Sequence, residues 1–146
     1  MVVIIDANIL LSAIIKPQGN LASIITLHIP ELEFVLPEYA IEEVNSNKEK
    51  ICQFSRISAS DFDNNFNLLL PYLPVLSSTE INIDDIEMAT KLAGLIDKKD
   101  ITYVAFSLAF DALIWTGDLI LLRGLRKKGF KNIISTAELK QIIKGL

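Results

Sequence analysis

The chain contains very little histidine or cysteine, with one residue of each, His28 and Cys52, among its 146. A single histidine excludes catalysis by two histidines that act as general acid and general base. A single cysteine excludes an intrachain disulfide and is typical of a protein in a reducing compartment. Acid–base chemistry in this chain would therefore rest mainly on its 18 Asp and Glu residues.

Long apolar runs are also missing, although hydrophobic residues make up 51% of the chain. No uninterrupted run reaches the roughly 18 residues that a membrane-spanning helix needs. Asp6 and Asp111 break the two richest stretches, and the N-terminus lacks the basic start of a signal peptide. We therefore expect a soluble, cytoplasmic protein with no membrane partner. Its apolar content suits a sheet covered on both faces and a dimer interface.

Positive charge is scarce, because 14 Lys and Arg face 18 Asp and Glu for a net charge of −4. This balance argues against a protein that binds nucleic acid through a broad basic surface. The basic residues do form one local cluster, which comprises Arg123, Arg126, Lys127, Lys128 and Lys131. Such a cluster is either the solvated end of a helix, where cations suit the dipole, or a local contact for phosphates.

The order of the predicted elements indicates one α/β domain over residues 1–146. No repeat, low-complexity tract or linker divides the chain. Apolar runs predict strands at 2–5, 33–36, 74–78, 112–116 and 132–135, of which the third is the least marked. Helical patterns separate these runs, and alternation of strands with helices predicts a parallel sheet flanked by helices.

Several polar residues are predicted to begin helices. Ser60 with Asp63, and Ser135 with Glu138, have the spacing of capping boxes. Asp84 and Asp100 precede two further helical patterns and can serve as N-caps.

Three carboxylates are predicted to meet at one edge of the sheet. Asp6 and Asp118 each follow a predicted strand. Asp100 begins the helix that precedes the fourth strand, and this helix must run antiparallel to that strand, which returns Asp100 to the same edge. Sites in such sheets form at the carboxyl ends of the strands. Carboxylates packed closely repel one another unless a hard divalent cation lies between them, so the pattern indicates a metal site.

Glu42 and Glu43 compete for a fourth carboxylate position. The helix predicted after Pro37 has an apolar stripe that includes Ala40 and Val44. Glu43 lies about 100° from the centre of that stripe and Glu42 about 160°, at the angular step of an α-helix. Glu43 is therefore expected at the boundary of the core, and Glu42 in solvent.

These residues resemble the motifs of a PIN domain, the fold of VapC-type toxins of toxin–antitoxin pairs and of related ribonucleases. The first piece is D-x-N after an apolar strand, here Asp6 and Asn8, and the second is Glu43-Val44 after a Pro-led helix. The most specific piece is D-x-x-Y-V-A-x-x-L-A at residues 100–109, followed by T-G-D at residues 116–118. Residues 46–80 carry no motif of the family.

The resemblance implies a five-stranded parallel sheet with strand order 3-2-1-4-5, and cleavage of RNA that depends on Mg²⁺ or Mn²⁺. It assigns catalysis and metal binding to four acidic residues, Asp6, Glu43, Asp100 and Asp118. Supporting roles, by hydrogen bonding or added charge, fall to Asn8, Thr116 and Asp97, and RNA phosphates are expected to contact Arg123 and Arg126. A homodimer and a small antitoxin are the implied protein partners.

Other functions remain open for the same pattern. Haloacid dehalogenase-like phosphatases transfer a phosphoryl group to an aspartate, but they carry D-x-D where this chain has Asn8 at the third position. A response-regulator-like or degenerate PIN domain would bind a protein without catalysis, and an RNA-processing factor would cleave RNA without being a toxin. The presence of all four acidic residues argues against degeneracy.

Overall fold

The sheet is parallel throughout, with strand order β3-β2-β1-β4-β5. It is seen in a computed structural model that describes residues 1–94 and 98–146. The strands are β1 (Val2–Ile5), β2 (Glu33–Pro37), β3 (Val75–Leu76), β4 (Leu113–Trp115) and β5 (Ile133–Ile134). This arrangement confirms the predicted fold class and strand order. It places β1 and β4 side by side, where the strand order reverses direction.

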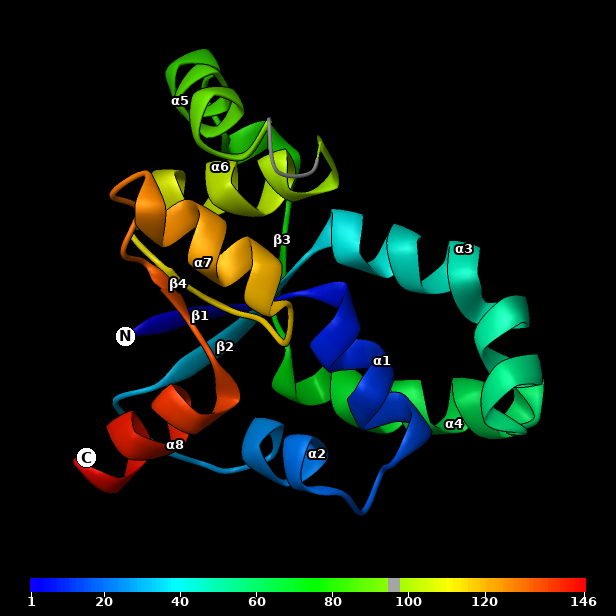
Figure 1. Ribbon diagram of the computed structural model, residues 1–146. Helices are drawn as coiled ribbons and strands as arrows, with labels where there is room; N and C mark the ends of the chain where they lie inside the picture. Colours follow the sequence, from blue (N-terminus) through cyan, green and yellow to red (C-terminus); the bar gives the residue numbers. More distant parts are fainter. Residues whose placement is uncertain (95–97) are drawn as a thin grey trace.

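Helices cover both faces of the sheet. The longer ones are α1 (Ala7–Ile15), α2 (Asn20–Ile25), α3 (Glu38–Ser55), α4 (Ala59–Leu69), α5 (Ile83–Ala93), α6 (Ile101–Phe110), α7 (Leu119–Lys127) and α8 (Thr136–Lys144). Single turns form η1 (Leu70–Tyr72), η2 (Ser78–Glu80) and η3 (Lys98–Asp100). Helix α1 packs against α2, α3 and α4, whereas α5 packs against α6 and α7. Figure 1 shows these two groups on opposite sides of the strands.

The core is built around the two central strands. Val3, Ile4 and Ile5 of β1 are fully buried, because β1 has a strand on each side and helices on both faces. Trp115 at the end of β4 is also fully buried, and its ring lies 5.7 Å from that of Phe34. Its indole N–H donates to the Thr136 hydroxyl at 2.9 Å, so this large side chain is both packed and hydrogen-bonded.

Helices α1 and α6 are both short. Their apolar composition matches their position, since many of their residues are buried in the core. Within the described ranges, the molecule has no helix that combines the length and apolar character needed to cross a bilayer.

Two predicted N-caps are wrong by two residues. Helix α4 is capped by Ser58, whose hydroxyl accepts from the Asp61 N–H, and not by Ser60. Helix α5 is capped by Asn82, whose side chain accepts from the Asp85 N–H, and not by Asp84. In each case a second residue of good capping chemistry stood nearby, and the backbone turns into the helix at the earlier one.

Of the other two predicted caps, one forms its capping hydrogen bonds and the other does not. The capping box of Ser135 and Glu138 is confirmed at the start of α8. Asp100 directly precedes α6, but its backbone is already helical and its side chain makes no capping hydrogen bond. The Asp100 side chain is therefore not used to begin the helix.

Helices α3 and α4 form an arm, which contains most of the segment without family motifs, residues 46–80. Figure 1 shows α3 extending away from the sheet and α4 running back toward it. Lys48 of α3 and Asp63 of α4 form a salt bridge of 2.7 Å across the arm. Asn65 ties α4 to α1 by donating to the Ile14 carbonyl at 2.9 Å. The arm thereby fixes α3, whose first turns carry Glu43.

Candidate active site

The first carboxylate of the site stands where β1 ends. Asp6 is only 6% exposed, and its Oδ1 accepts from the Ile9 N–H at 3.0 Å. It is thus the N-cap of α1, which explains why a charged residue is tolerated between a buried strand and a buried helix. The hydrogen bond from Ile9 helps to hold the side chain at the sheet edge.

The end of β4 meets the end of β1 through Thr116. Strand register places Ile5 opposite Trp115, so the following residues, Asp6 and Thr116, are neighbours. The Thr116 hydroxyl is hydrogen-bonded to the Asp6 side chain and accepts the Asp118 N–H at 3.0 Å. Because a hydroxyl has one proton, it accepts from Asp118 and donates to Asp6.

Asp118 begins helix α7 as Asp6 begins α1. Its Oδ1 accepts the N–H groups of Ile120 and Leu121 at 3.0 and 3.1 Å. Asp118 lies near enough to Asp6 for its negative charge to raise the pKa of the Asp6 carboxyl. Two carboxylates are therefore neighbours at the topological switch point of the sheet, as the strand-end argument predicted.

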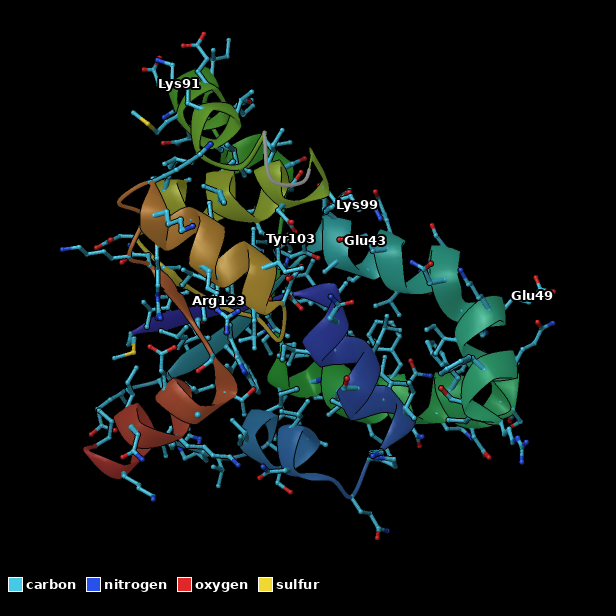
Figure 2. The ribbon with its side chains drawn as sticks, in the orientation of Figure 1. Glu43, Glu49, Lys91, Lys99, Tyr103 and Arg123 are labelled. Carbon is cyan, nitrogen blue, oxygen red and sulfur yellow. The ribbon has the colours of Figure 1, made fainter. Side chains whose placement is uncertain are left out.

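Glu43 reaches the same edge from α3 and is held there by Tyr103 of α6. The Tyr103 hydroxyl donates to Glu43 Oε1 at 2.6 Å, and it accepts the Ala7 N–H at 3.1 Å. Figure 2 shows Tyr103 and Glu43 pointing toward one another between α6 and α3. Glu42, in contrast, is exposed on α3.

A small hollow of about 30 Å³ joins these elements. It is lined by Asp6, Ala7, Asn8, Glu43, Asp100 and Tyr103. Three of the four predicted acidic residues thus face one hollow, whereas Asp118 is not part of its lining and stands beside Asp6. Of the supporting residues, Asn8 lines the hollow and Thr116 holds Asp6. Asp97 lies outside the residues that the structure describes.

Burial is the main cause of the raised pKa of the Asp6 carboxyl. Removal from water raises the pKa of its carboxyl, and the charge of Asp118 raises it further. Hydrogen bonds from Thr116 and from the N–H groups of Ile9 and Asn8 act in the opposite direction but do not cancel the effect. The surroundings of Asp6 therefore do not fully stabilise its negative charge, and a cation bound nearby would do so.

Tyr103 keeps its proton throughout the physiological range. Burial raises the pKa of its hydroxyl far above the usual value, and the hydrogen bond and charge of Glu43 and the charge of Asp6 add to this shift. The Ala7 N–H, which would stabilise a phenolate, is the weaker opposing effect. The hydroxyl is consequently a permanent donor to Glu43.

The donor chemistry of the hollow fits a hard divalent cation. Its acidic lining offers carboxylate oxygens, which Mg²⁺ and Mn²⁺ prefer, and the buried charge of Asp6 favours a cation there. As placed, however, no three Asp, Glu, His or Cys side chains within residues 1–94 and 98–146 are close enough to hold an ion together. Binding would therefore require the carboxylates to draw together around the ion.

Some residues of the basic cluster are bonded to other parts of the protein, whereas others face solvent. Arg126 forms a 2.6 Å salt bridge with Glu138 and donates to the Ile133 carbonyl at 3.0 Å, which ties α7 to β5 and α8. Lys128 donates to the Lys91 carbonyl at the end of α5. Arg123 is exposed on α7, as Figure 2 shows. The structure thus leaves Arg123 open to a ligand and commits the Arg126 guanidinium to the protein.

The role of Tyr103 was not foreseen from the sequence. Its position within an apolar helix reads as core, and the contact with Glu43 spans 60 residues. One signal was available: Tyr103 stands three residues after Asp100, which places both on one face of a helical segment. A hydroxyl at that spacing, in place of a purely apolar ring, marks a residue that faces the same edge as the carboxylate.

Comparison with known proteins identifies a PIN domain over residues 4–138. No curated protein sequence matches the chain. Two solved structures cover 92% of it: VapBC2 from Rickettsia felis bound to a DNA fragment from its promoter, and VapBC-1 from nontypeable Haemophilus influenzae. The first has 16% identity, a TM-score of 0.66 and 97% of its chain covered. The second has 15% identity, a TM-score of 0.64 and 98% of its chain covered. At these identities the likeness shows a shared fold.

Proposed function

Because the chain belongs to the PIN-domain family, we propose that it is a metal-dependent endoribonuclease that hydrolyses RNA phosphodiester bonds. One observation carries the proposal. Asp6, Glu43 and Asp100 come from three separate elements and line one hollow at the carboxyl ends of the central strands. A fold that needed these acids only for solubility would not direct three of them into the same hollow.

The four carboxylates have distinct parts in the proposed site. Asp6, Glu43 and Asp100 would hold Mg²⁺ or Mn²⁺, with Asp118 adding negative charge beside Asp6. When bound, the ion supplies positive charge that activates water and stabilises charge on the phosphate. Thr116 orients the Asp6 carboxylate by its hydrogen bond. Asn8 would position groups at the mouth of the hollow, and Asp97, three residues before Asp100 in the chain, would add negative charge.

RNA would approach along the start of α7. Asp118 begins this helix, so Arg123, in the second turn, lies near the carboxylate edge and is exposed. We expect Arg123 to bind a phosphate of the substrate. Arg126 would contribute less, because its guanidinium is already paired with Glu138 and the Ile133 carbonyl. A local contact of this kind is needed because the net charge of −4 repels RNA overall.

A toxin role is the finer part of the proposal. The two similar structures are VapBC complexes, one of them on promoter DNA. By analogy, the chain would be the toxin of a toxin–antitoxin pair, bound as a homodimer by a small antitoxin. Controlled expression in a bacterial host should arrest growth for wild type but not for Asp6→Asn. Growth without arrest, in the presence of cleavage in vitro, would instead favour an RNA-processing enzyme.

Cleavage of RNA with and without Mn²⁺ tests the nuclease directly. Wild type should cleave only with the ion, and Asp6→Asn should lose cleavage because it removes charge at the centre of the site. Asp111→Asn is the matched control. Asp111 is an exposed residue at the end of α6 in the left-handed conformation, which asparagine tolerates. No cleavage by wild type with either Mg²⁺ or Mn²⁺ would contradict the proposal and favour a protein-binding module.

A further inference from the structure

The hydrogen bonds of Tyr103 have only one possible direction. Its side chain is 2% exposed, and its hydroxyl has two close partners, the Ala7 N–H and Glu43 Oε1. The backbone N–H can only donate, so it occupies a lone pair of the hydroxyl oxygen. The single hydroxyl proton must then point to Glu43.

This hydroxyl joins three elements that are far apart in the chain. Tyr103 belongs to α6, Ala7 is the first residue of α1, and Glu43 lies on α3. The rings of Tyr39 and Tyr103 pack at a steep angle to one another, with centroids 6.0 Å apart and 66° between their planes. A buried, fully hydrogen-bonded tyrosine therefore fixes how far the Glu43 carboxylate extends into the hollow that both residues line.

We propose that Tyr103 is a positioning residue: it keeps the Glu43 carboxylate at the hollow, within reach of a metal ion around which the carboxylates draw together, and it links Glu43 to Ala7, the residue after Asp6. Its role in cleavage rests on the proposed function, whereas the positioning contact does not. Acidic metal ligands are commonly oriented by a hydrogen bond of this kind, and loss of such a partner typically reduces metal affinity or activity about 10- to 100-fold. The same factor is expected for loss of the Tyr103 hydroxyl.

Tyr103→Phe removes the hydroxyl and keeps the ring. The expected result is a Kd for Mn²⁺ raised about 10- to 100-fold in calorimetric titration, with the Mn²⁺ midpoint for RNA cleavage raised by the same factor. Ser107→Ala is the matched control, because Ser107 is a fully buried residue of the same helix whose hydroxyl bonds to the Ala112 carbonyl. It should lower stability while leaving the Kd within about twofold of wild type.

The comparison separates positioning from general destabilisation. A merely structural tyrosine would reduce the folded fraction, as Ser107→Ala does, without moving the Mn²⁺ midpoint of the folded molecules. A Kd for Tyr103→Phe equal to that of Ser107→Ala would overturn the inference. Recovery of cleavage by Tyr103→Phe at high Mn²⁺ would support it.

A double-mutant cycle tests the contact between Tyr103 and Glu43 even if the protein is not a nuclease. Unfolding by urea is measured for wild type, Tyr103→Phe, Glu43→Gln and the double variant. If Tyr103 holds Glu43, the fold-changes in the unfolding constant caused by the two single substitutions, each relative to wild type, should not multiply to the fold-change of the double variant. Simple multiplication would overturn the positioning contact. Absence of Mn²⁺ binding by wild type, with clear coupling, would instead overturn the proposed function and leave the contact standing.

Discussion

The hydroxyl of Thr116 donates to the carboxylate of Asp6, and this hydrogen bond links the ends of the two central strands. The same oxygen accepts the N–H of Asp118, so one 1%-exposed side chain positions the first and the last acidic residue of the site. A residue that looks like part of a simple Thr-Gly-Asp turn is therefore central to the arrangement of charge.

Thr116→Val should weaken metal binding clearly, although valine has nearly the same size and shape as threonine. The change keeps the shape of the side chain but takes the acceptor from the Asp118 N–H and removes one hydrogen-bond donor from the Asp6 carboxylate, which keeps the Ile9 N–H. We expect a Kd for Mn²⁺ raised about 10- to 100-fold and a loss of about 1–3 kcal/mol in the free energy of unfolding. Thr116→Ser restores the hydroxyl and should recover most of the affinity. Equal affinity in the valine and serine variants would contradict this role.

Removal of the Asp118 charge should weaken the response of stability to metal. Mn²⁺ stabilises the folded state by binding to it, by about 2.7 kcal/mol when the free ion is at 100 times its Kd. Asp118→Asn keeps an oxygen to cap α7 but removes the charge that acts on Asp6. Saturating Mn²⁺ should therefore raise the Tm of wild type more than that of Asp118→Asn. Equal increases would remove Asp118 from the metal site.

Glu43 and Glu42 form a matched pair on one helix. Glu43 lines the hollow and accepts from Tyr103, whereas Glu42 is exposed. Glu43→Gln should abolish metal-dependent cleavage, and Glu42→Gln should leave it nearly unchanged. Circular dichroism of both variants checks that α3 is intact. If Glu42→Gln were the more damaging change, Glu43 would not belong to the site.

Neutralisation of Arg123 should weaken RNA binding without affecting the fold. Arg123→Gln should lower affinity and flatten its salt dependence, since each lost phosphate contact reduces the slope of log K against log salt by about 0.7 for single strands. Lys128→Gln is the comparison and should change the slope less, because Lys128 follows the last residue of α7, farther from Asp118, and is bonded to the Lys91 carbonyl. An unchanged slope for Arg123→Gln would mean that RNA approaches from another face.

Acid should weaken the attachment of α8. The Arg126 hydrogen bond, helped by the Ser135 backbone, lowers the pKa of Glu138 below its ordinary value of 4.5. The unfolded chain then binds this proton more readily, so the stabilisation is present above that value and is lost as the pH falls below it. Glu138→Gln should lower the Tm at neutral pH, and the difference from wild type should shrink in acid. Glu49→Gln, at an exposed glutamate of α3, is the control.

The sheet could be predicted from the sequence because its strands are marked by buried apolar runs. The run at Val2–Ile5 ends in Asp6, and the run at Leu113–Trp115 ends near Asp118, so topology alone placed both acids at one edge. Strands β3 (Val75–Leu76) and β5 both have two residues and both lie at an edge of the sheet. Strand β3 was the less marked of the two because Val75 is exposed and Leu76 only partly buried, whereas both residues of β5 are buried.

The side-chain details of the site were harder to predict. Helix starts could be misplaced by two residues because serine, asparagine and aspartate compete as caps, and backbone geometry decides between them. The contact of Tyr103 with Glu43 depends on how α6 and α3 pack, which no local pattern encodes. Likewise, the pairing of Arg126 with Glu138 depends on where α8 lies, which the basic cluster in the sequence does not encode.

The strand order has a consequence for the timing of synthesis. Strands β1, β2 and β3 are neighbours and can pair as soon as they leave the ribosome, but β4 inserts on the other side of β1 and comes much later in the chain. Until then β1 has an open edge, and Asp6 has neither Thr116 nor Asp118 beside it. A translation product that stops before β4 would therefore be inert and prone to aggregate through that edge. In the proposed nuclease, activity could arise only after β4 and Asp118 have been synthesised.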